Sequence, residues 1–337
     1  MLRTALTLFI AIVGATALIA QPSLDPPAGP IEESGRFGTL IELSQDTAPG
    51  DADSVFRINE PGSYVLTGDV VVPFDTTGIE IASDDVTLDL NGYTIRGVEG
   101  SFGVGVGVPD ASEGAAEYSN LVVRNGVIRD VLTAVEVVDL DVPLGTAVFS
   151  VAPGATLDGL RISDCNDGID ATRASISDCV IEVQRRGIIN PKGGVDGCSV
   201  LISQGAFDFG AGIEVTSGRV TDTTVELGSA VEMGFPAFVV RESVVRGCTA
   251  LLAGNGTFGF VYVNDGASVS DCVVKNRSAS AADTVAFLGE GVTANCTAIG
   301  TSIGFQCLAG VVRGCAALEC TVASALLPGV VSDGNNF

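Results

Sequence analysis

The sequence contains no histidine and no tryptophan among its 337 residues. Without histidine, the chain cannot build a Ser-His-Asp triad, a histidine metal site or a histidine proton relay. Without tryptophan, and with only four tyrosines, it has few of the aromatic side chains that suit stacking against a sugar ring. These absences exclude several catalytic mechanisms before any motif is considered.

Basic residues and helical patterns are also scarce. The chain has 17 Lys+Arg against 41 Asp+Glu, a net charge of −24, and such a surface repels phosphate, so no nucleic-acid partner is expected. No helical period and no membrane-spanning apolar run follow residue 36, so no transmembrane segment is expected there. Apolar residues nevertheless make up 46% of the chain, which excludes a largely disordered protein.

The first 36 residues predict export. Arg3 precedes an apolar, uncharged stretch at residues 5–19, and Ala20 ends a small-residue segment suited to cleavage. We expect residues 1–20 to be a signal peptide and the proline-rich residues 21–36 to be a flexible leader. An uncleaved anchor is the alternative. The protein is therefore expected to be extracellular, periplasmic or on the cell surface.

A short repeat organises the chain after residue 150. Segments with an upstream Val or Ile end in a common slot that is preceded by Asp, Gly or Asn. The slots are Cys165, Cys179, Cys198, Thr223, Cys248, Cys272, Cys296 and Cys315. Asp, Asn and Gly tolerate a left-handed backbone, so we predict a sharp corner before each slot and an inward side chain in it.

Strand signals complete the repeating unit. Gly168, Gly187, Gly212 and Gly304 each stand 11 residues before a slot and precede an apolar residue, while alternation of strand type follows the slots. Short strands and tight corners in units of about 19–25 residues are typical of a parallel β-solenoid. We therefore predict an all-β parallel β-helix of roughly a dozen coils over residues 37–337.

The nine cysteines, an odd number, fit a buried column of reduced thiols better than a disulfide framework. Side chains stacked in parallel would strain a bridge, and Thr223 occupies one slot. One or two bridges among Cys307, Cys315 and Cys320 are the alternative. The absence of any Cys-x-x-Cys pair disfavours a metal site of the zinc type.

Several segments resemble a known group of proteins. Residues 61–69, 78–81, 84–97 and 121–129, above all the run Asp-Val-Thr-Leu-Asp-Leu-Asn-Gly at 85–92, resemble secreted bacterial right-handed parallel β-helix proteins of the pectin-lyase-like superfamily. The resemblance covers about residues 37–325 and implies a single-stranded right-handed parallel β-helix. It does not imply one function, because that superfamily includes lyases, hydrolases, epimerases, tailspikes and adhesins.

Two enzyme classes of that superfamily can be compared with the sequence. Its polygalacturonase-like hydrolases carry a Gly-His-Gly element, which a chain without histidine lacks. A polysaccharide lyase needs a base, and Arg185, Arg186 and Lys192 form a basic cluster that could supply it. Carboxylates of neighbouring coils could hold Ca²⁺. The candidate calcium ligands are Asp196, Asp208 and Glu214, with Glu182 as a further carboxylate. The alternative for all of them is a solvated sheet face.

Phenylalanines of the middle coils are the candidate ligand-binding residues. Phe207, Phe209 and Phe235 could protrude together and form an apolar patch for a sugar or a partner protein. The alternative is that the phenylalanines stack inside the helix.

Taken together, the residues favour a secreted, non-catalytic binding or structural rod that contacts polysaccharide or envelope proteins. The first alternative is a Ca²⁺-dependent lyase, which fits better than a hydrolase. The second is a self-associating or protein-binding envelope element. Catalysis, oligomeric state and ligand identity stay open at this point.

Overall fold

The structure, a computed structural model, describes residues 39–98, 103–109, 118–131, 146–150, 155–190, 192–204, 210–263, 266–278 and 283–335. The chain divides into two units, Met1–Phe37 and Gly38–Phe337, and every described residue belongs to the second. The expected signal peptide and leader lie outside the described residues. All regular elements in the described part are β-strands, so it holds no helix that could cross a membrane.

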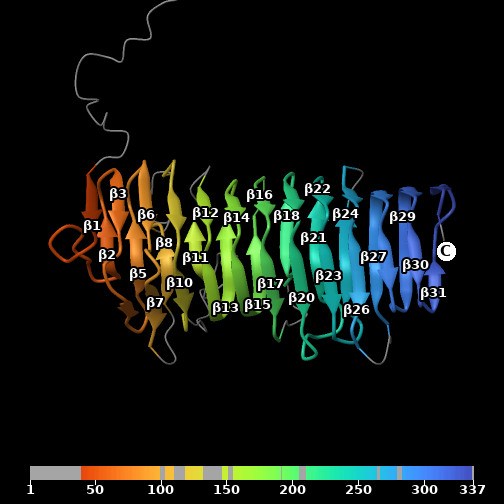
Figure 1. The fold of residues 1–337 in the computed structure, drawn as a ribbon, viewed down its shortest axis with the longest axis horizontal. Helices are drawn as coiled ribbons and strands as arrows, with labels where there is room; N and C mark the ends of the chain where they lie inside the picture. Colours follow the sequence, from red (N-terminus) through yellow and green to blue (C-terminus); the bar gives the residue numbers. More distant parts are fainter. Residues whose placement is uncertain are drawn as a thin grey trace, which may run out of the picture. The chain divides into compact units, whose positions relative to one another are not determined.

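The strands coil, and each one pairs in parallel with its equivalent in the next coil. For example, β13 (Arg161–Ala171) pairs with β15 (Val180–Ile189), and β14 (Ser175–Ser177) pairs with β16 (Gly194–Asp196). Along the long axis of Figure 1, the strands follow one another in chain order. The all-β parallel β-helix expected from the repeat is therefore confirmed.

Each coil contributes strands to three faces, which we number by the order in which a coil from β2 onward meets them. Face 1 consists of β2 (Ser54–Ile58), β5 (Thr77–Ile81), β8 (Val104–Gly107), β11 (Thr146–Ser150), the second halves of β13 and β15, β18 (Ile213–Thr216), β21 (Pro236–Arg241), β24 (Phe258–Val263), the first halves of β27 (Val285–Ala294) and β29 (Ile303–Arg313), and β31 (Val322–Ser324).

Face 2 consists of β1 (Leu40–Glu42), β3 (Gly62–Val65), β6 (Val86–Asp89), β9 (Val122–Arg124), β12 (Thr156–Asp158), β14, β16, β19 (Arg219–Thr221), β22 (Val244–Arg246), β25 (Ser268–Ser270), the second halves of β27 and β29, and β32 (Val331–Asp333). Face 3 consists of β4 (Val70–Val72), β7 (Thr94–Gly97), β10 (Val127–Arg129), the first halves of β13 and β15, β17 (Ser199–Ile202), β20 (Thr224–Leu227), β23 (Thr249–Leu252), β26 (Val273–Asn276), β28 (Thr297–Ile299) and β30 (Ala316–Leu318).

The lumen is filled by columns of like side chains, because parallel register places equivalent residues directly above one another. One column on face 1 runs through Ile169, Ile188, Ile213, Phe238, Phe260, Phe287 and Phe305, all buried. Its phenylalanine rings lie nearly parallel, with successive centroids 4.4, 5.3 and 4.9 Å apart. These four rings stack inside the coil, as the alternative interpretation of the sequence expected.

The corner between faces 2 and 3 has the predicted left-handed backbone. The residue before each slot has a positive φ there. These residues are Asp178 (51°), Gly197 (61°), Asp222 (47°), Gly247 (68°), Asp271 (54°), Asn295 (53°) and Gly314 (60°). Asp, Asn and Gly therefore occupy these positions because other residues would strain the turn.

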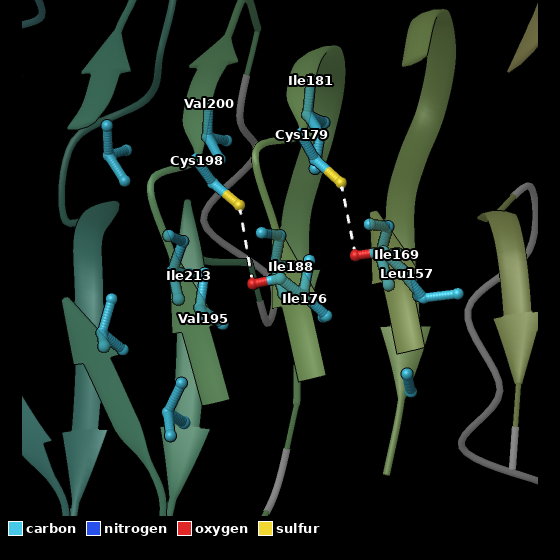
Figure 2. Close-up of a cluster of buried hydrophobic side chains, with 14 of the residues drawn as sticks. Leu157, Ile169, Ile176, Cys179, Ile181, Ile188, Val195, Cys198, Val200 and Ile213 are labelled. Atoms are coloured by element: carbon cyan, nitrogen blue, oxygen red, sulfur yellow. Dashed lines mark hydrogen bonds between the residues drawn. The ribbon is translucent and has the colours of Figure 1, made fainter. Parts of the chain in front are cut away.

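Six of the nine cysteines form the predicted buried column of free thiols, and Cys165, Cys307 and Cys320 lie outside it. All nine are free, and every one except the half-buried Cys320 is buried. Figure 2 shows Cys179 and Cys198 in successive coils, their sulfurs directed at the carbonyl oxygens of Leu157 and Ile176. Cys165, however, pairs with Val183 and lies at the corner between faces 3 and 1. Its local sequence resembles the slot motif because both corners use the same turn.

The glycine before the apolar column on face 1 allows successive coils to approach closely. A Cβ on Gly187 would lie 2.3 Å from the carbonyl oxygen of Gly212 and 2.3 Å from Val200 Cγ1, whereas one on Gly194 would meet nothing within 4 Å. We expect Gly187→Ala to lower the free energy of unfolding by about 1–3 kcal/mol through overpacking. Gly194→Ala should change it by less than about 0.5 kcal/mol.

Urea denaturation of both variants measures this difference. Equal stabilities for Gly187→Ala and Gly194→Ala would contradict the close approach at Gly187.

Candidate functional site

Six charged side chains gather over face 1 in successive coils, and we call them the face 1 cluster. They are Asp167 and Asp170 on β13, Arg185 and Arg186 on β15, Glu214 on β18 and Arg241 on β21. A Cβ on Gly168 or on Gly187 would point into the lumen, against Ile181 and Val200 respectively. Ile169 also points inward, so strict alternation is interrupted at Gly168 and Ile169. Alternation from Ile169 directs Asp170 outward, and the charges of Asp167 and Arg186 act on its carboxyl.

The ionic pair in this cluster occupies a position that is apolar in later coils. Asp167 is in register with Arg186 on the next coil. Further along the same face, the equivalent residues are Pro236, Phe258, Val285, Ile303 and Val322. The buried charges are thus a local feature of two coils and are not required by the repeat itself.

Asp167 binds two arginines. Its Oδ2 lies 3.1 Å from Arg186 Nη2 and its Oδ1 lies 3.3 Å from Arg186 Nε, so the guanidinium donates in a bidentate fashion. Arg185 Nε lies 3.6 Å from the same Oδ1. The carboxylate is 3% exposed and the Arg186 side chain 12%. Burial raises the pKa of Asp167, against the opposing charges of Arg186 and Arg185, and burial lowers the pKa of Arg186.

Asp170 is the cluster residue with proton-transfer character. Burial raises the pKa of its carboxyl from 3.8 to about 6; Arg186 opposes this shift, while the negative charges of Asp167 and Glu214 add to it. A carboxylic acid that keeps its proton near pH 6 can serve as a general acid.

Glu214 lies two coils from Asp170 in the same outward column, with Ile189 between them in register. Two strand spacings separate the two backbones, or ~10 Å. Glu214 forms an ion pair with Arg241 that is partly exposed on both sides. The cluster therefore presents a protonatable acid at one end and a paired carboxylate at the other.

Comparison with known proteins identifies the fold. No protein-family profile matches the sequence, and no curated protein is detectably similar to it. Among solved structures, the chain resembles the A-module of the Azotobacter vinelandii mannuronan C-5 epimerase AlgE6, with a TM-score of 0.52, 12% identity, and 82% of this chain and 90% of that one covered.

A tailspike protein of E. coli bacteriophage HK620 gives a TM-score of 0.55 at 12% identity, over 82% of this chain and 58% of that one. The catalytic domain of a GH87 α-1,3-glucanase gives 0.52 at 11% identity, over 88% and 64%. The chain shares the right-handed parallel β-helix fold with these structures. At these identities the likeness concerns the fold of the β-helix alone.

The β-helix brings together two of the three basic residues singled out in the sequence. Arg185 and Arg186 both belong to the face 1 cluster. Lys192 does not, because it lies in the turn between faces 1 and 2, with an exposed side chain and a positive φ of 63°. A guanidinium held by two hydrogen bonds to a buried carboxylate, as in Arg186, is poorly placed to take a proton from a substrate.

The expected calcium ligands are not gathered by the described part of the fold. Asp196 ends a strand of face 2 and accepts a hydrogen bond from the Thr221 hydroxyl, whereas Glu214 lies on face 1 with Arg241. Asp208 lies outside the described residues. Within the described ranges, no group of three or more carboxylates and thiols could hold a metal ion.

The expected aromatic patch needs a correction at Phe235. This side chain is 1% exposed and packs in the core, because the turn before β21 directs it inward. A buried ring cannot stack against a sugar. Phe207 and Phe209 lie outside the described residues, so their exposure stays a prediction.

Sequence analysis missed Asp167, Asp170 and Arg241. The two aspartates flank Gly168 and Ile169, which the repeat had already placed on a strand. Alternation from the inward Ile169 would have directed Asp170 outward. That signal was available, but the coupling of Asp170 to residues of later coils was not, because it depends on coil register.

The raised pKa of Asp170 predicts a pH-dependent stability. Since its pKa is about 6 in the folded protein against an ordinary 3.8, the folded state binds this proton more tightly. The stability it contributes is fully present below pH ~4 and is lost as pH rises through ~6. The free energy of unfolding of Asp170→Asn, taken relative to the parent protein, should therefore be up to ~3 kcal/mol higher at pH 7 than at pH 4.

Urea denaturation at both pH values gives this difference. The exposed Asp46 offers a matched control, since Asp46→Asn should shift the two free energies equally. A difference for Asp170→Asn that stays constant between pH 4 and pH 7 would contradict a buried, protonated Asp170.

Proposed function

We propose that this protein is an exported β-helix that binds polysaccharide across the outer side of face 1, with the face 1 cluster as the contact site. The observation that carries the proposal is the presence of buried, mutually paired charges at Asp167 and Arg186, at a register position held by Thr146 in the coil before and by apolar residues in later coils. Such pairs rarely add stability over an apolar core, so their presence beside the outward-facing Asp170 favours a role in recognition.

The chemistry of the cluster suits a glycan. Guanidinium groups donate in fixed directions and carboxylates accept, so together they can match the hydroxyl groups of a sugar. Three acids and three arginines balance in charge when all are ionised, whereas the whole chain carries −24. The cluster thus spares a neutral or weakly acidic glycan much of the repulsion that the rest of the surface exerts.

The solved structures that share this fold support the choice of ligand class. They include a mannuronan epimerase, a phage tailspike and an α-1,3-glucanase. A stack of parallel coils offers the same hydrogen-bonding directions at regular intervals, and a polymer of repeating sugars can follow that periodicity. Export, predicted from residues 1–20, would bring the protein to such polymers.

A second candidate function is glycoside hydrolysis, favoured by the raised pKa of Asp170. Asp170 would protonate the leaving oxygen, and Glu214 would activate water. The ~10 Å between their backbones is close to the ~6.5–9.5 Å that separates the carboxyl groups of inverting enzymes. The bidentate contact to Asp167 occupies Arg186, which favours this assignment over a lyase that uses Arg186 as its base.

Size-exclusion chromatography of residues 21–337 with neutral and anionic polysaccharides tests both candidates. Co-elution with an intact glycan is expected, and Arg241→Gln should weaken binding about tenfold, the loss of one hydrogen bond to a charged group. Arg313→Gln on face 2 is the control and should bind normally.

Three outcomes discriminate between the candidates. Glycan fragments that disappear in Asp170→Asn would establish hydrolysis. Equally strong binding by Arg241→Gln and Arg313→Gln would show that the binding site is not on face 1. No binding to any glycan would overturn the proposal.

A further inference from the structure

The corner between faces 2 and 3 holds a stack of thiols in two runs, which Thr223 separates. Cys179 and Cys198 form the first, and Thr223 follows. The second run consists of Cys248, Cys272, Cys296 and Cys315. The carbonyl oxygen of each column residue accepts a hydrogen bond from the amide that follows the next column residue. For example, Ser199 N donates to Cys179 O, and Thr297 N donates to Cys272 O. All six thiols are 0–2% exposed.

The spacing of this stack opposes disulfides but suits a bridging ion. Equivalent residues of adjacent coils are one strand spacing apart, ~4.8 Å, and their side chains are parallel. A disulfide would have to draw the two sulfurs to ~2.05 Å and the Cβ atoms below ~4.5 Å. Two metal–sulfur bonds of ~2.3 Å placed end to end span ~4.6 Å, which matches the coil spacing without backbone movement.

The apolar lumen favours an ion whose binding leaves no net charge. A net charge buried among apolar side chains is costly. A monovalent cation between one thiolate and one neutral thiol replaces a single proton and leaves the pair neutral. The balance is two thiols plus M⁺ giving thiolate–M–thiol plus one H⁺. A divalent cation would need to displace two protons to reach neutrality.

We propose that the corner column binds soft monovalent cations, Cu(I) or Ag(I), each bridging the sulfurs of two successive coils. Thiolates prefer soft ions, and two ligands in line do not meet the tetrahedral demand of Zn²⁺. If each thiol serves one ion, the six thiols give a capacity of three ions, for example at Cys179–Cys198, Cys248–Cys272 and Cys296–Cys315. The site is independent of face 1 and of any glycan.

Native mass spectrometry of the full chain tests the proposal with Ag⁺ as the probe. The protein is refolded from urea without oxygen and with excess Ag⁺, so that access to the lumen does not limit binding, and weakly held ions are then removed with excess methionine. Three Ag⁺ are expected on the folded protein, each replacing one proton in the measured mass.

Two variants distinguish binding in the column from binding elsewhere, and each introduces a residue that the chain already has at an equivalent position. Cys198→Thr follows Thr223, which fills the same column, and should retain two ions instead of three. Cys165→Val follows Val183, its register partner at another corner, and should retain three. Folded protein without retained Ag⁺, or three ions on Cys198→Thr, would overturn the proposal.

Discussion

Backbone hydrogen bonding between parallel strands of successive coils determines the position of every other group in this protein. It keeps equivalent residues one strand spacing apart and directs their side chains the same way, inward or outward. Each position in the coil therefore belongs to a column, and the side chain at that position must pack against the equivalent side chains of the coils before and after it. The glycines before the apolar column on face 1 exist because the backbones approach too closely there for a Cβ.

Inside the coil, this constraint favours columns of identical or similar side chains. Isoleucine stacks on isoleucine, phenylalanine on phenylalanine and thiol on thiol, so that close packing is repeated along the lumen without new side-chain geometry in each coil. The same constraint holds reduced thiols at a distance too long for a disulfide. Thr223 shows that a polar residue is accepted in the column when its hydroxyl binds the backbone, here the carbonyl of Thr221.

Outside the coil, columns are free to vary, and variation there carries function. Asp167 and Arg186 place charges in two coils at a register position that is apolar in later coils. Together with Arg185 they surround Asp170 with charge in a site that water reaches poorly. Burial raises the pKa of Asp170 more than the nearby arginine lowers it. One carboxyl of an acidic protein thus keeps its proton near pH 6, in a cluster whose other acids are paired with arginines.

The sequence alone determined the coil: glycine spacing, slot residues and their left-handed neighbours follow from local backbone geometry, and they were confirmed for every slot except Cys165. Its local motifs could not distinguish the two corners, so Cys165 was assigned to the wrong column, and Phe235 was expected outside. Which charges meet was decided only by tertiary structure. Asp170 and Glu214 are 44 positions apart and come within two strand spacings because coil length sets their register, and the burial that shifts a pKa is a property of the packed coils.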